Sequence, residues 1–150
     1  MSQESEALEH YHIAGKGKTE IGQSKYYNDQ PADYLFYKAL ANYQTQGKEA
    51  AKATFDQMIE WAEDSISDEV KTDFFAVSLP DLIVFNNDLQ AENQVHCLFV
   101  KAMGQLGLHL IGEKPMNDFD ETIEALLQKN PAHSKANLFK KMAKTLETTL

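Results

Sequence analysis

The stretch VHCLFVKAMGQL, residues 95–106, carries the pattern that decides the fold class. Its apolar residues recur three and four positions apart, which places them on one face of an α-helix. They are Val95, Leu98, Phe99, Ala102, Met103 and Leu106. The same spacing appears in residues 32–46, 51–62, 119–127 and 139–146, and no segment sustains the period-two alternation of a strand. We therefore expect an all-α chain of seven or eight helices.

Glycine, proline and polar residues predict where these helices begin and end. Gly47 should end the helix of residues 32–46, because glycine enters the left-handed conformation freely. The turn there is so short that the next helix must fold back antiparallel. Pro31 suits a first helical turn, where its missing N–H costs nothing. The residues expected to cap helix starts are Asp29, Asp68, Ser78, Ser134 and the run Asn86-Asn87-Asp88.

At 150 residues the chain is long enough for one domain with its own core. Within that single domain the helical pattern and its interruptions define five parts. They are an orphan helix and loop (1–30), a first hairpin (31–64), a helical insert (65–87), a second hairpin (88–130) and a C-terminal capping helix (131–150).

Charge and cysteine content exclude several classes of function. The formal net charge is −9, with 14 basic residues against 23 acidic ones, so nucleic acid and anionic membranes are not expected partners. The single cysteine allows no internal disulfide, which fits a reducing compartment. The N-terminal residues lack the apolar core of a signal peptide, and no apolar run approaches a membrane span. We expect a cytoplasmic protein.

Several residue pairs resemble the tetratricopeptide repeat, in which a small residue and a larger one four positions later let helices of neighbouring hairpins approach. The matching pairs are Ala51 with Phe55 and Ala7 with Tyr11, while Phe119 with Ile123 departs at the small position. Met103-Gly104 occupies the Leu-Gly position of the motif, but Gly107 stands where an aromatic residue is expected. The resemblance implies a tetratricopeptide-like α-α superhelix of stacked antiparallel hairpins with degenerate repeats.

Two longer stretches, YYNDQPADYLFYKALANYQTQGK (26–48) and FFAVSLPDLIVFNNDLQAENQVHC (74–97), give a more specific likeness. They resemble the C-terminal helical tail of large bacterial tetratricopeptide-repeat proteins that carry an uncharacterised mutarotase-like β-sandwich module. The likeness covers residues 26–145 and carries over no sugar-binding or catalytic residue. It implies that residues 4–14 are the second helix of a repeat within a longer protein; a gene that encodes the tail alone is the alternative.

The sequence offers little for catalysis. The single thiol, Cys97, would need His109 or His133 brought to it by folding to form a nucleophile pair. No histidines or cysteines have the short spacing of a zinc site. The acidic run Asp118, Asp120, Glu121 and Glu124 lacks the glycine-bearing loop of an EF-hand and fits the first turn of a helix. We expect no enzyme activity, no metal and no cofactor.

A non-catalytic protein–protein interaction or scaffolding module is the function that remains. We expect it to bind a protein, a peptide or a sister domain of its parent chain, and a homodimer is open. Polar residues of the first helix of each hairpin would line a concave face that receives an acidic or extended peptide. They are Lys38, Asn42, Gln94, Lys101 and Gln105.

Three alternatives accompany this expectation. One is a purely structural tail that completes the hydrophobic core of a larger chain. The apolar segment FFAVSLPDLIVF (74–85) is either a buried wedge between the hairpins or an exposed patch that docks a partner. The rival function is an accessory or regulatory domain of a carbohydrate-metabolising enzyme, which follows only from the likeness to multidomain relatives.

Overall fold

The computed structural model describes residues 3–22, 30–69 and 88–148. Over these residues it contains helices and no strand, which confirms the all-α class. The helices are α1 (Gln3–Ala14), α2 (Asp33–Gln46), α3 (Lys48–Ser65), α4 (Leu89–Leu110), α5 (Met116–Lys129) and α6 (Ser134–Glu147). The two further helices expected between residues 70 and 85, and the segment 74–85, lie outside the described residues.

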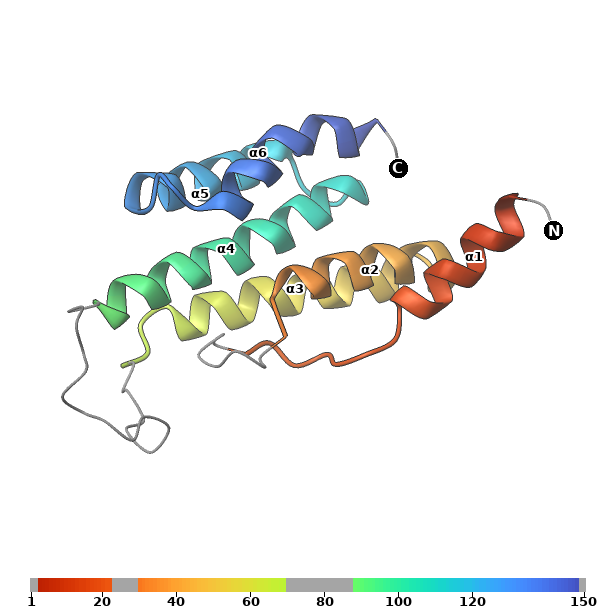
Figure 1. Cartoon of the computed structure of the whole chain (residues 1–150), viewed down its shortest axis with the longest axis horizontal. Helices are drawn as coiled ribbons and strands as arrows, with labels where there is room; N and C mark the ends of the chain where they lie inside the picture. The colour runs from red at the N-terminus through yellow and green to blue at the C-terminus, as the bar shows by residue number, and fades with distance from the viewer. Residues whose placement is uncertain (1–2, 23–29, 70–87, 149–150) are drawn as a thin grey trace.

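The longest helix, α4, is the centre of the fold (Figure 1). It packs against α3 on one side and α5 on the other, and it also contacts α2 and α6. A single residue joins α2 to α3, and five residues join α4 to α5, so each pair forms a helical hairpin. In contrast, α1 packs mainly on α2 and projects beyond the rest of the structure (Figure 1).

Helix ends follow local chemistry in most places. Gly47 has a φ of 93°, and its N–H donates to the carbonyl oxygens of Asn42 and Tyr43, both at 3.2 Å, so it ends α2 as expected. The Asp88 carboxylate accepts hydrogen bonds from the N–H groups of Gln90 and Ala91, so it caps α4 as expected.

Two predicted starts differ in the structure. Ser134 is the first residue of α6 rather than its cap, because Nδ1 of His133 accepts the hydrogen bond from the Ala136 N–H at 3.1 Å. Pro31 precedes α2, which begins at Asp33 with no side-chain cap. Asp29, the cap expected there, lies outside the described residues.

Four fully buried phenylalanines, one from each of four helices, belong to the hydrophobic core. They are Phe36 of α2, Phe55 of α3, Phe119 of α5 and Phe139 of α6. The ring of Phe36 lies 6.0 Å from that of Phe55 and 5.4 Å from that of Phe139, so it joins the first hairpin to the last helix. Full burial of a side chain of this size stabilises a fold by about 1.5–3 kcal/mol.

The close approach of α3 and α4 depends on a residue without a side chain. A Cβ atom at Gly104 would lie 2.8 Å from both the Phe55 carbonyl oxygen and Cγ1 of Ile59. Backbone cannot yield as a side-chain tip can, so the distance between the two helices depends on this glycine.

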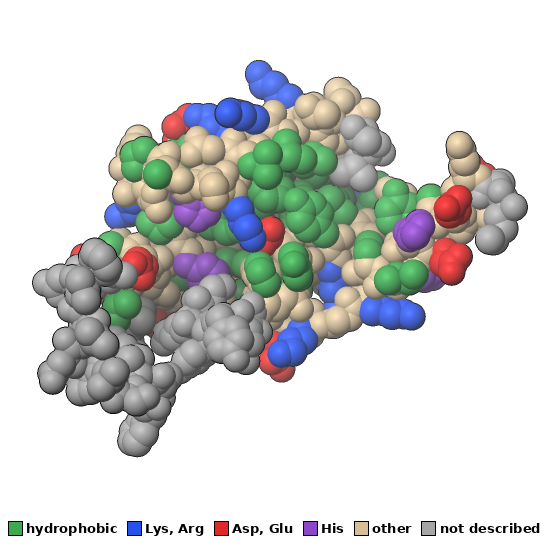
Figure 2. All heavy atoms as spheres, in the orientation of Figure 1, with side chains coloured by type: hydrophobic (Ala, Val, Ile, Leu, Met, Phe, Trp, Pro, Cys, Tyr) green, Lys and Arg blue, Asp and Glu red, His purple; other side chains and the backbone are tan. Residues whose placement is uncertain are grey.

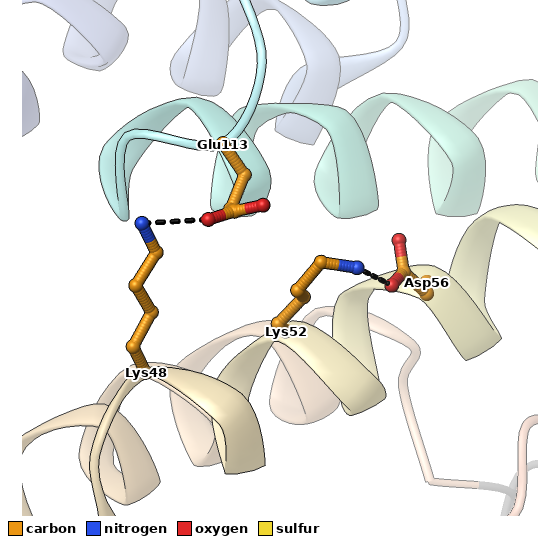
Figure 3. Close-up of polar contacts among 4 residues, drawn as sticks. All are labelled: Lys48, Lys52, Asp56 and Glu113. Atoms are coloured by element: carbon orange, nitrogen blue, oxygen red, sulfur yellow. Dashed lines mark hydrogen bonds and ion pairs between the residues drawn. The ribbon is translucent and has the colours of Figure 1, made fainter.

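Ion pairs join the helices at the surface. At one end of the fold, the ammonium of Lys48 at the start of α3 lies 2.6 Å from the carboxylate of Glu113 in the α4–α5 connection (Figure 3). Beside it, one turn further along α3, Lys52 pairs with Asp56 of the same helix, so this second pair supports α3 itself. Exposed pairs such as these contribute about 0–1 kcal/mol each, so they adjust the packing of the helices rather than cause it.

None of the helices described is both long and apolar enough to cross a membrane.

Candidate interaction surface

Two of the five residues expected on a hydrated concave face are buried, so that expectation was wrong for them. Asn42 is 9% exposed and Gln105 is 7% exposed. The cause is the position of their helices. Asn42 packs against Gly15 and accepts a hydrogen bond from Gln46, and Gln105 lies in the half of α4 where residues 102–108 are all buried.

The other three expected residues are held by neighbours inside the chain. Lys38 donates to the carbonyl oxygens of Gly17 at 2.7 Å and of Lys18 at 3.3 Å. Lys101 pairs with Glu63 of α3 at 2.8 Å. Gln94 accepts a hydrogen bond from Lys129 of α5 at 2.9 Å. These contacts run to three different parts of the fold, so the five residues do not form one shared face.

A different surface, made of exposed apolar side chains on α1 and α2, stands out in their place. On α1, Leu8 is 46% exposed, Tyr11 38% and Ile13 57%; on α2, Tyr34 is 57% exposed and Tyr37 43%. The two helices are in contact with each other. Figure 2 shows hydrophobic side chains on the projecting α1 and near the middle of this face, where α2 and α6 meet.

A small open pocket lies within this surface. Its lining residues are Ala14, Lys16, Gln30, Tyr34, Tyr37 and Lys38, and its volume is about 190 Å³. This volume falls below the several hundred Å³ of a typical small-molecule site, so the pocket suits one or two side chains of a partner. Burial, with the nearby Asp33 carboxylate, raises the pKa of Tyr37 above 10.0, which keeps its hydroxyl a neutral donor.

The aromatic residues of this pocket were not among the residues selected from the sequence. Tyr34 and Tyr37 stand three positions apart, off the core-facing stripe of Phe36, Ala39 and Tyr43. A second aromatic stripe on the outer face of an amphipathic helix was the signal that could have identified them.

Cys97 is unsuited to nucleophilic catalysis. It is fully buried in α4, and its Sγ lies 3.9 Å from Oδ1 of Asn93. Burial, and secondarily the Asp68 carboxylate, raises the pKa of the thiol to about 11. A reactive cysteine needs the thiolate form, which this environment opposes.

Three of the five histidines have structural partners. Nε2 of His96 lies 3.0 Å from the Gly22 carbonyl oxygen, and burial lowers its pKa. His133 caps α6, and burial lowers its pKa too. The ring of His109 lies within hydrogen-bond distance of the Lys114 carbonyl oxygen and of the Glu147 carboxylate, at 3.0 and 3.1 Å. Within the described ranges, no three His, Cys, Asp or Glu residues are grouped so that they could hold a metal ion.

No protein-family model matches the chain, and no solved structure is significantly similar to it.

Proposed function

We propose that this chain is a non-catalytic protein–protein interaction module that acts in the cytoplasm. The observation that carries the proposal is the exposed apolar surface of α1 and α2, defined by Leu8, Tyr11, Ile13, Tyr34 and Tyr37. Exposed large apolar and aromatic side chains are common at docking sites, and tyrosine in particular is enriched there. Lys16 and Lys38 beside the two tyrosines add the polar contacts that give such a site its specificity.

We also propose that the architecture is a degenerate tetratricopeptide-like stack of hairpins. Support comes from α2–α3 and α4–α5, which are successive helical hairpins packed through α3 and α4. Ala51 and Phe55, the small and large residues of the motif, are both fully buried, and the glycine of the Leu-Gly position, Gly104, lies at the α3–α4 contact. In such a stack the core holds the scaffold rigid and leaves outer side chains free for recognition.

The test is affinity capture from a cell extract with the unchanged chain and two variants. Leu8→Ser combined with Tyr34→Ser removes exposed apolar side chains of α1 and α2, whereas Leu138→Ser removes one from α6. Substitutions at exposed sites change stability by about 0.5 kcal/mol, so all three proteins should fold. We expect partners that the unchanged chain and the Leu138 variant capture and the double variant loses. An identical set from all three proteins would refute the assignment of this surface.

A further inference from the structure

Helix α1 contacts α2 but is largely uncovered in the structure of a single chain. None of its twelve residues is buried, and Leu8, Tyr11 and Ile13 remain exposed. Isolated helices of about 12 residues are marginal in water, because helix nucleation is costly and few backbone hydrogen bonds follow it. Figure 1 shows α1 extending past the ends of the other helices. A surface that covers these side chains would therefore stabilise α1 as well as bind it.

The charged residues of α1 are acidic at neutral pH. Glu4, Glu6 and Glu9 are exposed, and α1 contains no lysine. Over residues 3–22, 30–69 and 88–148, none of these three carboxylates forms an ion pair. The arm formed by α1 thus combines unpaired acidic groups with uncovered apolar groups.

The surface next to α1 on the same chain has the opposite charge. Lys16, Lys18 and Lys38 lie at the pocket or beside it, and no carboxylate in the described part of the chain lies within ion-pair distance of them. The ammonium of Lys38 is held by two backbone carbonyls, which leaves the third of its three donors for another acceptor. Tyr34 and Tyr37 supply exposed aromatic surface between these lysines.

We propose that a second copy of this chain covers both surfaces, with α1 of each copy lying on the lysine–tyrosine pocket of the other. The proposal rests on the proposed function and names the partner as the same chain. The arm and the pocket complement each other in charge and in apolar character, and every copy carries one of each. In a dimer with a two-fold axis, each arm lies on the pocket of the other copy. No arm or pocket is then left for a third copy.

The net charge of −9 makes a specific arrangement necessary. Two copies repel each other over most of their surfaces, so association must use a place where the signs differ locally. The lysines around the pocket supply that place.

Sedimentation equilibrium over a hundredfold range of protein concentration tests the proposal. We expect the unchanged chain to form dimers as the concentration rises. The double variant Glu6→Lys with Glu9→Lys reverses the charge of the α1 arm. The double variant Lys16→Glu with Lys38→Glu reverses the charge around the pocket. Each reversal alone should weaken dimerisation about tenfold or more, since it replaces several surface ion pairs by like-charge contacts. Glu60→Lys with Asp64→Lys, on the exposed side of α3, changes the net charge as much as the arm reversal and should leave the dimer intact.

A mixture of the two reversed proteins gives the sharpest outcome. In a mixed dimer each arm meets a pocket of opposite charge, so we expect heterodimers in the mixture although each protein alone is monomeric. The proposal is overturned if the unchanged chain stays monomeric throughout, or if neither reversal affects the dimer. A monomer would still capture a different partner through Leu8 and Tyr34, so failure here is distinguishable from failure of the proposed function.

Discussion

The ring of Phe55 on α3 occupies the space that a side chain at position 107 of α4 would need. A Cβ atom at Gly107 would lie 2.2 Å from Cε1 of that ring and 2.3 Å from Cδ1, well inside contact distance. The tetratricopeptide motif that Met103-Gly104 resembles has an aromatic residue three positions further on, where this chain has Gly107. In this chain the aromatic ring comes from Phe55 of the neighbouring helix α3, and it fills the space that Gly107 leaves open on α4.

This relationship predicts that Gly107→Ala destabilises the protein. Overpacking a tight core costs about 1–3 kcal/mol, whereas alanine gains about 1 kcal/mol over glycine inside a helix. We expect a net loss of unfolding free energy, measured by urea denaturation. Phe55→Leu in the same chain should relieve the clash, so the double variant should lose less than the sum of the two single losses. Strict additivity would show that ring and glycine are not coupled.

Removal of the α4 cap should weaken the central helix. Asp88→Ala leaves the N–H groups of Gln90 and Ala91 without their acceptor and should cost about 1 kcal/mol of unfolding free energy. Asp88→Asn keeps an acceptor oxygen in place and should cost much less. Urea denaturation monitored by circular dichroism measures both losses. Equal losses in the two variants would argue against a capping role.

Cys97 should be protected from thiol reagents in the folded protein. Its pKa of about 11 reduces the thiolate near pH 8 roughly a hundredfold relative to an ordinary thiol, and burial also blocks access. We expect labelling by a chromogenic disulfide to be slow in buffer and rapid in guanidinium chloride. The chain has one cysteine, so the signal belongs to that residue alone. Rapid labelling of the native protein would contradict the burial of this thiol.

Stability should fall as the solution is acidified below the ordinary histidine pKa of 6.5. Burial lowers the pKa of His133 in the folded protein, so the unfolded chain binds the proton first. The stability that the neutral ring contributes is present above pH 6.5 and is lost as the pH falls through the folded-state pKa. The neutral ring is also the form whose Nδ1 accepts the capping hydrogen bond from Ala136.

His133→Asn tests this pH dependence. Asparagine caps helices well and does not titrate, so the variant should keep α6 while losing part of the pH dependence. The free energy of unfolding is measured by urea denaturation at about pH 7.5 and about pH 5.5, on either side of the ordinary histidine pKa. The same loss of stability in both proteins on acidification would assign the effect to other groups, such as His96, whose pKa burial also lowers.

The sequence by itself determined that the chain is helical and where most helices end. Helical periodicity, the left-handed Gly47 and the Asp88 cap are local properties, because each involves residues within about one turn. The prediction that Ser134 caps α6 was wrong for a reason that is also local. The side chain of His133, one residue earlier, accepts the hydrogen bond from the Ala136 N–H.

Only the tertiary structure decided which side chains meet solvent. Asn42 and Gln105 lie off the apolar stripes of their helices, yet both are buried, since α4 has neighbours on several sides and Gly15 packs on α2. Tyr34 and Tyr37 are partly exposed because an open pocket borders that part of α2, although Phe139 of α6 lies against the Tyr37 ring. Periodicity describes one helix at a time, whereas exposure depends on how many others pack around it.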